Sequence, residues 1–146
     1  MSRRFYLSEA ESLLPQVSAW IQEAVFLKSE CQEAENKIEA LSQKVMLFGG
    51  IIVDRERAQA VRTRRDETLE QLKATVEKIH ETGCIVKDLD KGLVDFPTLF
   101  RGEEVYLCWK MDEPAIEFWH RIEDGFAGRT AIDQEFRDNH KGDPLT

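Results

Sequence analysis

Apolar residues recur at alternating intervals of three and four along the first third of the chain. Ser8 and Glu11 have the spacing of a capping box, which predicts a helix that starts at Ser8. Pro15 predicts a kink in its first turns. Two series with a spacing of seven follow, and every member is apolar or cysteine: Ala10, Val17, Ala24, Cys31, Ile38 and Val45, and Leu13, Trp20, Leu27, Ala34, Leu41 and Phe48. This heptad predicts a helix of about 40 residues that packs lengthwise against another helix.

A second helix is predicted after a glycine break. Gly49-Gly50 ends the first helix, and Asp54 can cap the next one. Gly83 is placed to end the second helix. Its apolar seam is poorer, because Arg62 and Arg65 interrupt the first half. The apolar members of that seam are Ala58, Val61, Leu69, Leu72, Val76 and Ile79.

Short strand-like runs follow the helices. Strands are predicted at Cys84–Asp88, Leu93–Phe96 and Val105–Trp109, because these runs are rich in β-branched, aromatic and apolar residues. Pro97 is expected to end the second strand. Pro114 is expected to open a short helix that packs across the strands. The apolar face of that helix would consist of Ile116, Trp119 and Ile122.

The predicted fold is α+β and mainly α. Residues 1–82 are expected to form a long antiparallel helical hairpin, similar to a coiled coil. Residues 83–132 are expected to form a compact segment with a small three-stranded antiparallel meander and a short helix. Residues 133–146 are mostly polar, and we expect a flexible tail that can be removed without loss of the fold.

The charge and composition exclude several kinds of partner. The 146 residues carry a formal net charge of −8, which would repel a nucleic-acid backbone. No apolar run is long enough to cross a membrane, and the first residues lack the features of a secretion signal. The three cysteines, Cys31, Cys84 and Cys108, lie far apart in the sequence, as is typical of reduced thiols. We therefore expect a cytoplasmic protein.

Several motifs occur in the segment after the hairpin and at the opening of the first helix: Gly83–Asp90, Gly92–Pro97, Leu107–Trp109, Glu117–His120, Gly125–Arg129, Tyr6–Ala10 and Leu13–Pro15. Together they resemble the signature of an uncharacterised bacterial family known as domain of unknown function 2203. The resemblance implies a bacterial origin and a set of motif positions, but it implies no reaction. Whether the protein is an enzyme therefore stays open.

Two Glu-x-x-His pairs could contribute to a metal site. They are Glu77 with His80 and Glu117 with His120. On a helix this spacing places both side chains on one face, as in carboxylate-bridged di-metal bundles. The chain offers no obvious pair of further glutamates, so we favour ordinary surface pairs. A divalent metal ion at Glu117 and His120 is kept as an alternative, although for His120 a hydrogen-bonded, partly buried histidine is favoured.

Charged residues on the predicted strands could line a small-ligand site. Lys87, Asp88 and Asp95 are expected to lie near Trp109 where the strands meet the Pro114 helix, and Arg129 could close the rim. A surface ion-pair cluster is the favoured alternative. The run from Asp88 also resembles the opening of a calcium loop, but its spacing is too short, so we favour a polar turn.

Two further patterns receive simpler interpretations. Cys84 or Cys108 could act as a nucleophile only if the fold brings His120 close. The arginines of the second helix point to opposite sides, so they do not form a nucleic-acid stripe. We expect them to pair with glutamates of a neighbouring helix.

Two hypotheses for function follow from the sequence. We favour an oligomeric structural or interaction protein that self-associates through its hairpin, because the first helix offers more apolar seam than the second can cover. The alternative is a small-ligand- or metal-binding module around His120 and the strands.

Overall fold

A computed structural model describes residues 3–48 and 55–144, with side chains for residues 3–44 and 55–144. The chain divides into two compact units. The first comprises Met1–Gln22 and Val76–Thr146, and the second, which we call the hairpin unit, comprises Glu23–Thr75. The predicted boundary after residue 82 therefore does not coincide with a boundary between units. The predicted α+β fold class is confirmed.

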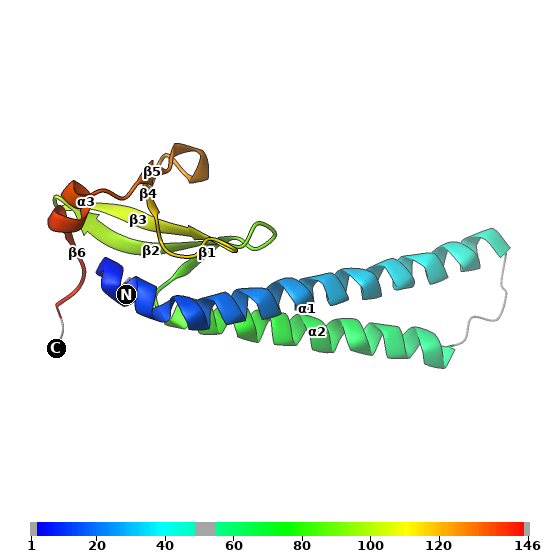
Figure 1. The fold of residues 1–146 in the computed structure, drawn as a ribbon. Coiled ribbons are helices and arrows are strands. Elements are labelled where there is room, and N and C mark those ends of the chain that lie inside the picture. The colour runs from blue at the N-terminus through cyan, green and yellow to red at the C-terminus, as the bar shows by residue number, and fades with distance from the viewer. Residues whose placement is uncertain (1–2, 49–54, 145–146) are drawn as a thin grey trace. The chain divides into compact units, whose positions relative to one another are not determined.

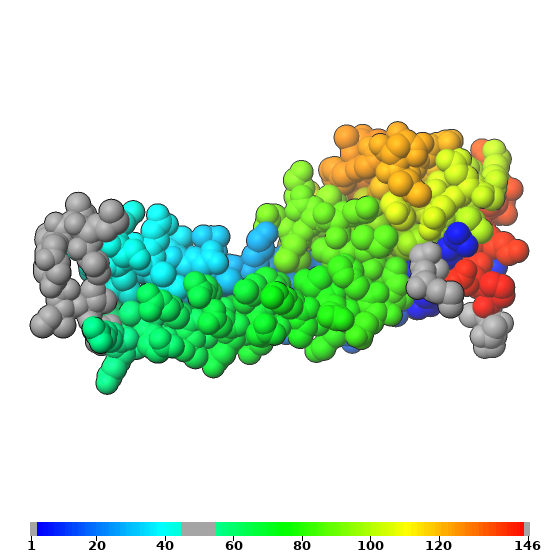
Figure 2. Space-filling model, turned by 180° about the vertical axis from the view of Figure 1, so that it is seen from behind, coloured from blue at the N-terminus to red at the C-terminus, as the bar shows by residue number. Residues whose placement is uncertain are grey.

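Two long helices supply the hairpin unit. Helix α1 spans Leu7–Phe48 and α2 spans Arg55–Glu81. Within the hairpin unit the two helices lie against each other (Figures 1 and 2). The predicted seam is buried at Ala24, Leu27, Cys31 and Ala34. The predicted break at Gly49-Gly50 and the cap at Asp54 lie outside the described residues.

The second helix contributes two threonines to its buried face. Thr68 and Thr75 are 3% and 2% exposed. The Thr75 hydroxyl donates to the carbonyl of Gln71 at 3.0 Å and also lies 3.3 Å from Glu23 Oε1. A buried hydroxyl is tolerated here because it is hydrogen-bonded within its own helix.

The start of α1 differs from the prediction. The helix begins at Leu7, and the backbone N–H of Tyr6 donates to Glu9 Oε1 at 2.9 Å. Glu9 therefore supplies the reaching-back half of a capping box centred on Tyr6, two residues before the predicted box. The prediction of a box at Ser8 was wrong, because two overlapping spacings fit the same acidic segment. The helix continues through Pro15.

The sheet is antiparallel and larger than predicted. The predicted meander consists of β1 (Ile85–Asp88), β2 (Leu93–Phe100) and β3 (Glu103–Lys110), in that spatial order. Strands β4 (Phe118–Arg121) and β5 (Thr130–Ala131) extend it beyond β3, where a 3-10 turn, η1 (Phe126–Gly128), precedes β5. Strand β6 (His140–Lys141) pairs with the second half of β2 (Figure 1).

The prediction that Pro97 ends its strand was wrong. Pro97 lies inside β2, opposite Tyr106 of β3. The Pro97 carbonyl accepts from the backbone N–H of Phe5 at 2.7 Å, so it points away from β3. In a strand the N and the O of one residue point to the same side. The missing N–H of proline therefore removes no hydrogen bond from the ladder between β2 and β3.

The predicted helix after Pro114 is also absent, and β4 takes its place. The β4 strand pairs with β3, with Leu107 opposite Trp119 and Tyr106 opposite His120. Ile122, expected on the packed face of a helix, is 49% exposed. The residues involved are aromatic or β-branched, which suits a strand once β3 provides a partner.

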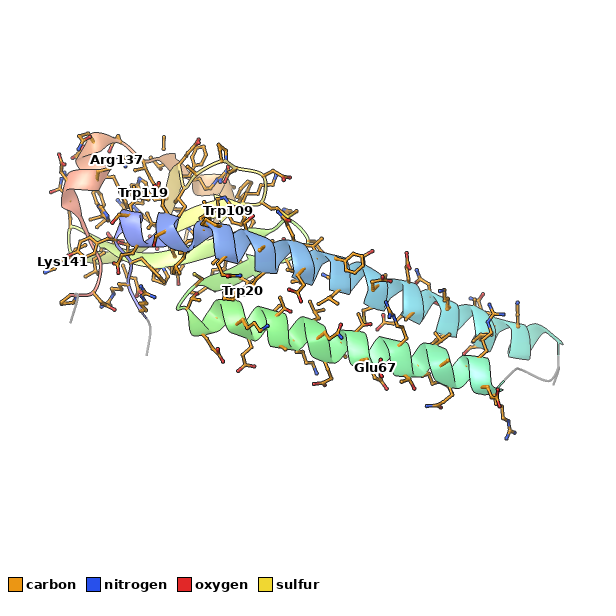
Figure 3. The ribbon with its side chains drawn as sticks, turned by 60° about the horizontal axis from the view of Figure 1, so that its bottom comes forward. Trp20, Glu67, Trp109, Trp119, Arg137 and Lys141 are labelled. Atoms are coloured by element: carbon orange, nitrogen blue, oxygen red, sulfur yellow. The ribbon has the colours of Figure 1, made fainter. Side chains whose placement is uncertain are left out.

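Residues 133–144 are ordered, so the prediction of a flexible tail was wrong for them. Helix α3 spans Gln134–Asn139, and Asp133 caps it by accepting from the Phe136 N–H at 2.8 Å. Phe136 is 1% exposed. Its ring lies 4.8 Å from that of Phe100 and 5.0 Å from that of Trp119. Figure 3 shows Arg137 and Lys141 of this segment beside the sheet that carries Trp119.

The core of the first unit lies between the start of α1 and one face of the sheet. Phe5 and Phe96 meet edge to face with their ring centroids 5.5 Å apart. The fully buried side chains of this core include Ala10, Val17, Ile21, Ile79, Val94, Val105 and Leu107. The opposite face of the sheet carries the polar residues described next. Among the described helices, none combines the length and apolar character needed to span a membrane.

Candidate functional site

Strand register brings three polar side chains to one face of the sheet. Asp95 of β2 lies directly opposite Cys108 of β3, and Tyr106 of β3 lies opposite His120 of β4. Cys108 and Tyr106 are two residues apart and therefore share a face. Asp95, Cys108 and His120 thus come from three adjacent strands, and their exposures are only 1%, 1% and 4%.

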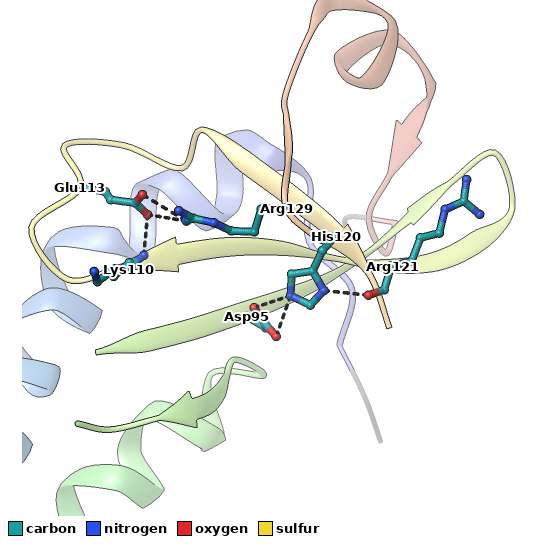
Figure 4. Close-up of polar contacts among 6 residues, drawn as sticks. All are labelled: Asp95, Lys110, Glu113, His120, Arg121 and Arg129. Carbon is teal, nitrogen blue, oxygen red and sulfur yellow. Dashed lines mark hydrogen bonds and ion pairs between the residues drawn. The ribbon is translucent and has the colours of Figure 1, made fainter. Parts of the chain in front are cut away.

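The donor atoms of these residues converge. His120 Nε2 lies 3.2 Å from each carboxylate oxygen of Asp95 (Figure 4). One donor atom from each of Asp95, Cys108 and His120 can be chosen so that all three lie within 4.8 Å of one another. Carboxylate, thiolate and imidazole are all transition-metal ligands. Among the described residues no other such group of three was found.

The carbonyl of Arg121 fixes where His120 holds its proton. A carbonyl oxygen only accepts, so Nδ1, at 2.7 Å from the Arg121 oxygen, carries a hydrogen and donates it. In a neutral ring, Nε2 then presents a lone pair to both oxygens of Asp95. Acceptors that face each other at this distance repel. The gap therefore has to hold a proton or a cation.

Burial dominates the acid–base properties of the cluster. It raises the pKa of the Asp95 carboxyl, and the charge and hydrogen bond of His120 act in the opposite direction. Burial and the neighbouring Asp95 carboxylate raise the pKa of the Cys108 thiol to about 12, although Arg129 acts to lower it. Cys108 is therefore a protonated thiol at neutral pH. It is a poor nucleophile even though the fold does bring His120 close.

A cation and a phenol border the cluster. The Lys87 ammonium lies 5.0 Å from the centroid of the Tyr106 ring, which in turn meets the His120 ring at 5.6 Å. The charge of Lys87 acts against burial and partly offsets the rise in the pKa of the Asp95 carboxyl. Lys87 is exposed, whereas Tyr106 is half-buried, so the two separate the cluster from solvent on this side.

Arg129 and Glu113 form a second polar group near Cys108. Arg129 Nη1 lies 3.0 and 3.1 Å from the two carboxylate oxygens of Glu113 (Figure 4). The guanidinium is 4.2 Å from the ring centroids of both Phe118 and Phe126. This pair is largely shielded, with side-chain exposures of 15% and 20%, so it holds Arg129 in a fixed position.

The structure brings together only part of the predicted site. Asp95 and His120 are in contact, and Lys87 and Arg129 border them. Trp109 points to the opposite face, where its Nε1 donates to the Glu113 carbonyl at 2.9 Å. These placements follow from the strand alternation between Cys108 and its neighbour Trp109.

Two other predicted residues lie apart from the cluster. Asp88 accepts from the Lys91 N–H at 3.1 Å, which agrees with the favoured polar turn. Glu117 is exposed, whereas His120 is buried. Glu117 directly precedes β4, which replaces the predicted helix, so Glu117 and His120 do not share the helix face on which the predicted pairing depends.

Sequence reasoning missed the place of Cys108 and Glu113. Cys108 was considered only as a nucleophile, and its contact with Asp95 depends on the β2–β3 register. Glu113 accepts from the Lys110 N–H at 2.7 Å and holds Arg129. The only sequence signal for Glu113 was its position in the turn after β3.

Fold and site together define a protein that combines a long helical hairpin with an antiparallel sheet and a buried carboxylate–thiol–imidazole cluster. The chain belongs to the DUF2203 family of uncharacterized conserved proteins, whose model matches residues 3–132. That match covers the hairpin and every residue of the cluster. Neither a curated protein nor a solved structure matches the chain.

Proposed function

We propose that this protein is a metal-binding protein that holds one divalent transition-metal ion, best Zn²⁺, between Asp95, Cys108 and His120. The observation that carries the proposal is the orientation of His120. Its Nδ1 hydrogen is committed to the Arg121 carbonyl, and its Nε2 lone pair faces the Asp95 carboxylate. A cation between them satisfies both groups.

The spacing of the donor atoms supports this proposal. Two ligands bound to Zn²⁺ at about 2.0–2.1 Å with tetrahedral angles lie about 3.3 Å apart. Nε2 of His120 and the Asp95 oxygens are 3.2 Å apart. Metal-bound histidines usually donate their other ring N–H to a carbonyl or carboxylate, as His120 does to Arg121.

The charges of the ligands also suit a divalent ion. The Asp95 carboxylate and a Cys108 thiolate together balance two positive charges, and the metal lowers the pKa of the thiol that it binds. Binding therefore releases the Cys108 proton. Three protein ligands leave a fourth position, which a water molecule or a small anionic ligand would fill. Lys87, which borders the cluster beside Tyr106, would supply a positive charge for such an anionic ligand.

A cobalt titration tests the proposal. Co²⁺ replaces Zn²⁺ in such sites and gives a thiolate-to-metal absorption band. We expect one Co²⁺ per chain in the reduced 146-residue protein, loss of the band in Cys108→Ser, and weaker binding in Asp95→Asn. Cys31→Ser and Cys84→Ser are matched controls, because both thiols are buried but lie outside the cluster. A band that survives in Cys108→Ser, or no band in the wild-type protein, would refute the site.

The state of the cysteines supports a reducing location. Cys31, Cys84 and Cys108 are all buried and unpaired. Free buried thiols persist where glutathione and thioredoxin keep them reduced. We therefore propose that the protein works in the cytoplasm, where a Cys108 ligand stays available for metal.

A further inference from the structure

The side chain of His140 ties residues 133–144 to the start of α1. His140 follows α3 and is the first residue of β6. The backbone N–H of Leu7, the first residue of α1, donates to its Nε2 at 2.9 Å. Its Nδ1 lies 2.8 Å from the carbonyl oxygen of Arg137. The imidazole therefore joins two segments that are 133 positions apart in the sequence.

These two contacts fit one protonation state of the imidazole. The Leu7 N–H can only donate, so Nε2 has to offer a lone pair, and the Arg137 carbonyl can only accept, so Nδ1 carries the hydrogen. A proton on Nε2 would remove the lone pair and set two N–H groups against each other. It would also place a positive charge at the N-terminus of α1, which is already the positive end of the helix dipole. Protonation of His140 therefore breaks its contact with Leu7.

We propose that His140 is an acid-sensitive latch, whose neutral imidazole holds residues 133–144 against α1 and the sheet and whose protonation releases them. Imidazole is the side chain that changes its charge between about pH 5 and pH 8, so release falls in that interval. The latch is separate from the proposed metal site, because the residues that His140 contacts do not include Asp95, Cys108 or His120.

The contacts of residues 133–144 explain how one histidine can control the segment. The Phe136 ring stacks on the imidazole, with the ring centroids 5.5 Å apart and an angle of 11° between the ring planes. Strand β6 consists of His140 and Lys141, and His140 pairs with Phe100 of β2. The ring stack and the strand pairing therefore meet at the same residue. Its release would uncover Phe100 and Trp119, whose rings lie 4.8 and 5.0 Å from that of Phe136.

The charged groups around His140 offer no counter-ion to an imidazolium in the docked position. In the described part of the chain, His140 has neither a hydrogen bond nor an ion pair with a carboxylate. The carboxylates on the neighbouring elements bond elsewhere: Glu9 with the Tyr6 N–H, Glu104 with Arg4, Asp133 with the Phe136 N–H, Glu135 with Arg101, Asp138 with Gln134, and Asp143 with the Arg4 N–H. The cations there are Arg3, Arg4, Arg101, Arg137 and Lys141. The Tyr6 ring meets the imidazole edge to face, with the centroids 5.9 Å apart.

Hydrogen–deuterium exchange read by mass spectrometry tests the latch in the reduced 146-residue protein with a chelator present. We expect the amides of residues 134–141 to be protected at about pH 8 and to lose protection about tenfold or more at about pH 5, after correction for the chemical exchange rate at each pH. Residues 13–22 of α1 should keep their protection at both pH values. Equal protection of residues 134–141 at both pH values, or a loss that spreads through α1, overturns the proposal.

Two substitutions of His140 separate the latch from other effects of acid. In His140→Gln the amide oxygen can accept from the Leu7 N–H while the amide N–H₂ donates to the Arg137 carbonyl, and the amide does not titrate. This variant should keep residues 134–141 protected at both pH values. In His140→Lys the side chain is cationic throughout, so these residues should already be released at the higher pH.

His80→Gln is the matched control. Nε2 of His80 also accepts from a backbone N–H, that of Val86 at 3.3 Å, but this contact involves β1 and not residues 133–144. The control should release residues 134–141 at the lower pH as the wild-type chain does. Release in His140→Gln at the lower pH, wild-type protection in His140→Lys at the higher pH, or loss of the acid response in His80→Gln contradicts the assignment of the latch to His140.

Discussion

Two substitutions of Asp95, the partner of His120, should lower the free energy of unfolding by very different amounts. Asp95→Ala leaves Nε2 of His120 and the Cys108 thiol buried with no carboxylate to bond. Removing one partner of a buried charged pair costs about 3–5 kcal/mol. For a chain of this size, that loss corresponds to a melting temperature lower by about 10–15 °C.

Asparagine at the same position should be far milder in the metal-free protein. Because Nδ1 of His120 carries the ring hydrogen, Nε2 can accept from the amide N–H₂ of Asp95→Asn. The side-chain shape is conserved, so we expect a loss of about 1 kcal/mol or less. The same variant should weaken Co²⁺ binding, since a neutral amide replaces a charged ligand.

Urea unfolding with a chelator present, followed by circular dichroism, measures both free energies. Glu117→Ala serves as the control, because Glu117 is exposed directly before β4 and should change stability by less than about 0.5 kcal/mol. Equal losses for the alanine and asparagine variants would refute the assigned proton on Nδ1. A loss below about 1 kcal/mol for Asp95→Ala would show that the pair contributes little.

Three further perturbations test the fold. Phe136→Ala should lower the free energy of unfolding by about 3–5 kcal/mol in the same urea assay, because its ring is 1% exposed and packs on Phe100 and Trp119; a change below 1 kcal/mol would restore the flexible tail. Gly92→Ala should cost more than Gly102→Ala, since both have positive φ but only at Gly92 would a Cβ meet Met111, at 2.5 Å; comparable melting temperatures would contradict this. Burial raises the pKa of Cys84 from 9.0 to about 11, so its stabilising contribution is complete below pH 9 and is lost as the pH rises through 11. Cys84→Ala should therefore lose less stability than the wild-type chain between pH 9 and 11 in urea titrations, and parallel curves would show that Cys84 is not responsible.

The helical part of the fold was predictable because its signal is local. A heptad that runs through Leu27 and Ala34 marks a buried seam whatever the rest of the chain does. The segment around Trp119 carries no such local signal. Its aromatic and β-branched residues fit either a helix or a strand, and pairing with β3 decided between them.

Two other errors also depend on distant partners. Whether Pro97 ends a strand depends on which side its nitrogen faces, and only the contact with Phe5 reveals this. Phe136 is one aromatic residue in a polar stretch, and it is buried because Phe100 and Trp119 meet it from elsewhere. A composition argument counts the residues of the segment alone and misses such partners.

The candidate site was predictable in its members more than in its geometry. Asp95 and His120 were identified by residue type and by their place among aromatic residues. Their contact, and the inclusion of Cys108, depend on a diagonal relation across three strands that no spacing in the sequence encodes. The Glu-x-x-His spacing misled, because it carries meaning only on a helix.

The division of the chain has a consequence for the order of folding. Residues 1–22 and 76–146 belong to one unit, and the backbone of Arg4 exchanges hydrogen bonds with Asp143, 139 positions later. Contacts this distant in sequence are slow to form, because a long loop must close first. The hairpin unit between them is built from neighbouring segments and can form early. Once formed, the hairpin unit holds residues 22 and 76 close together and so shortens the loop that must close. The segment that separates the two halves of the first unit in sequence therefore also speeds the formation of contacts between them.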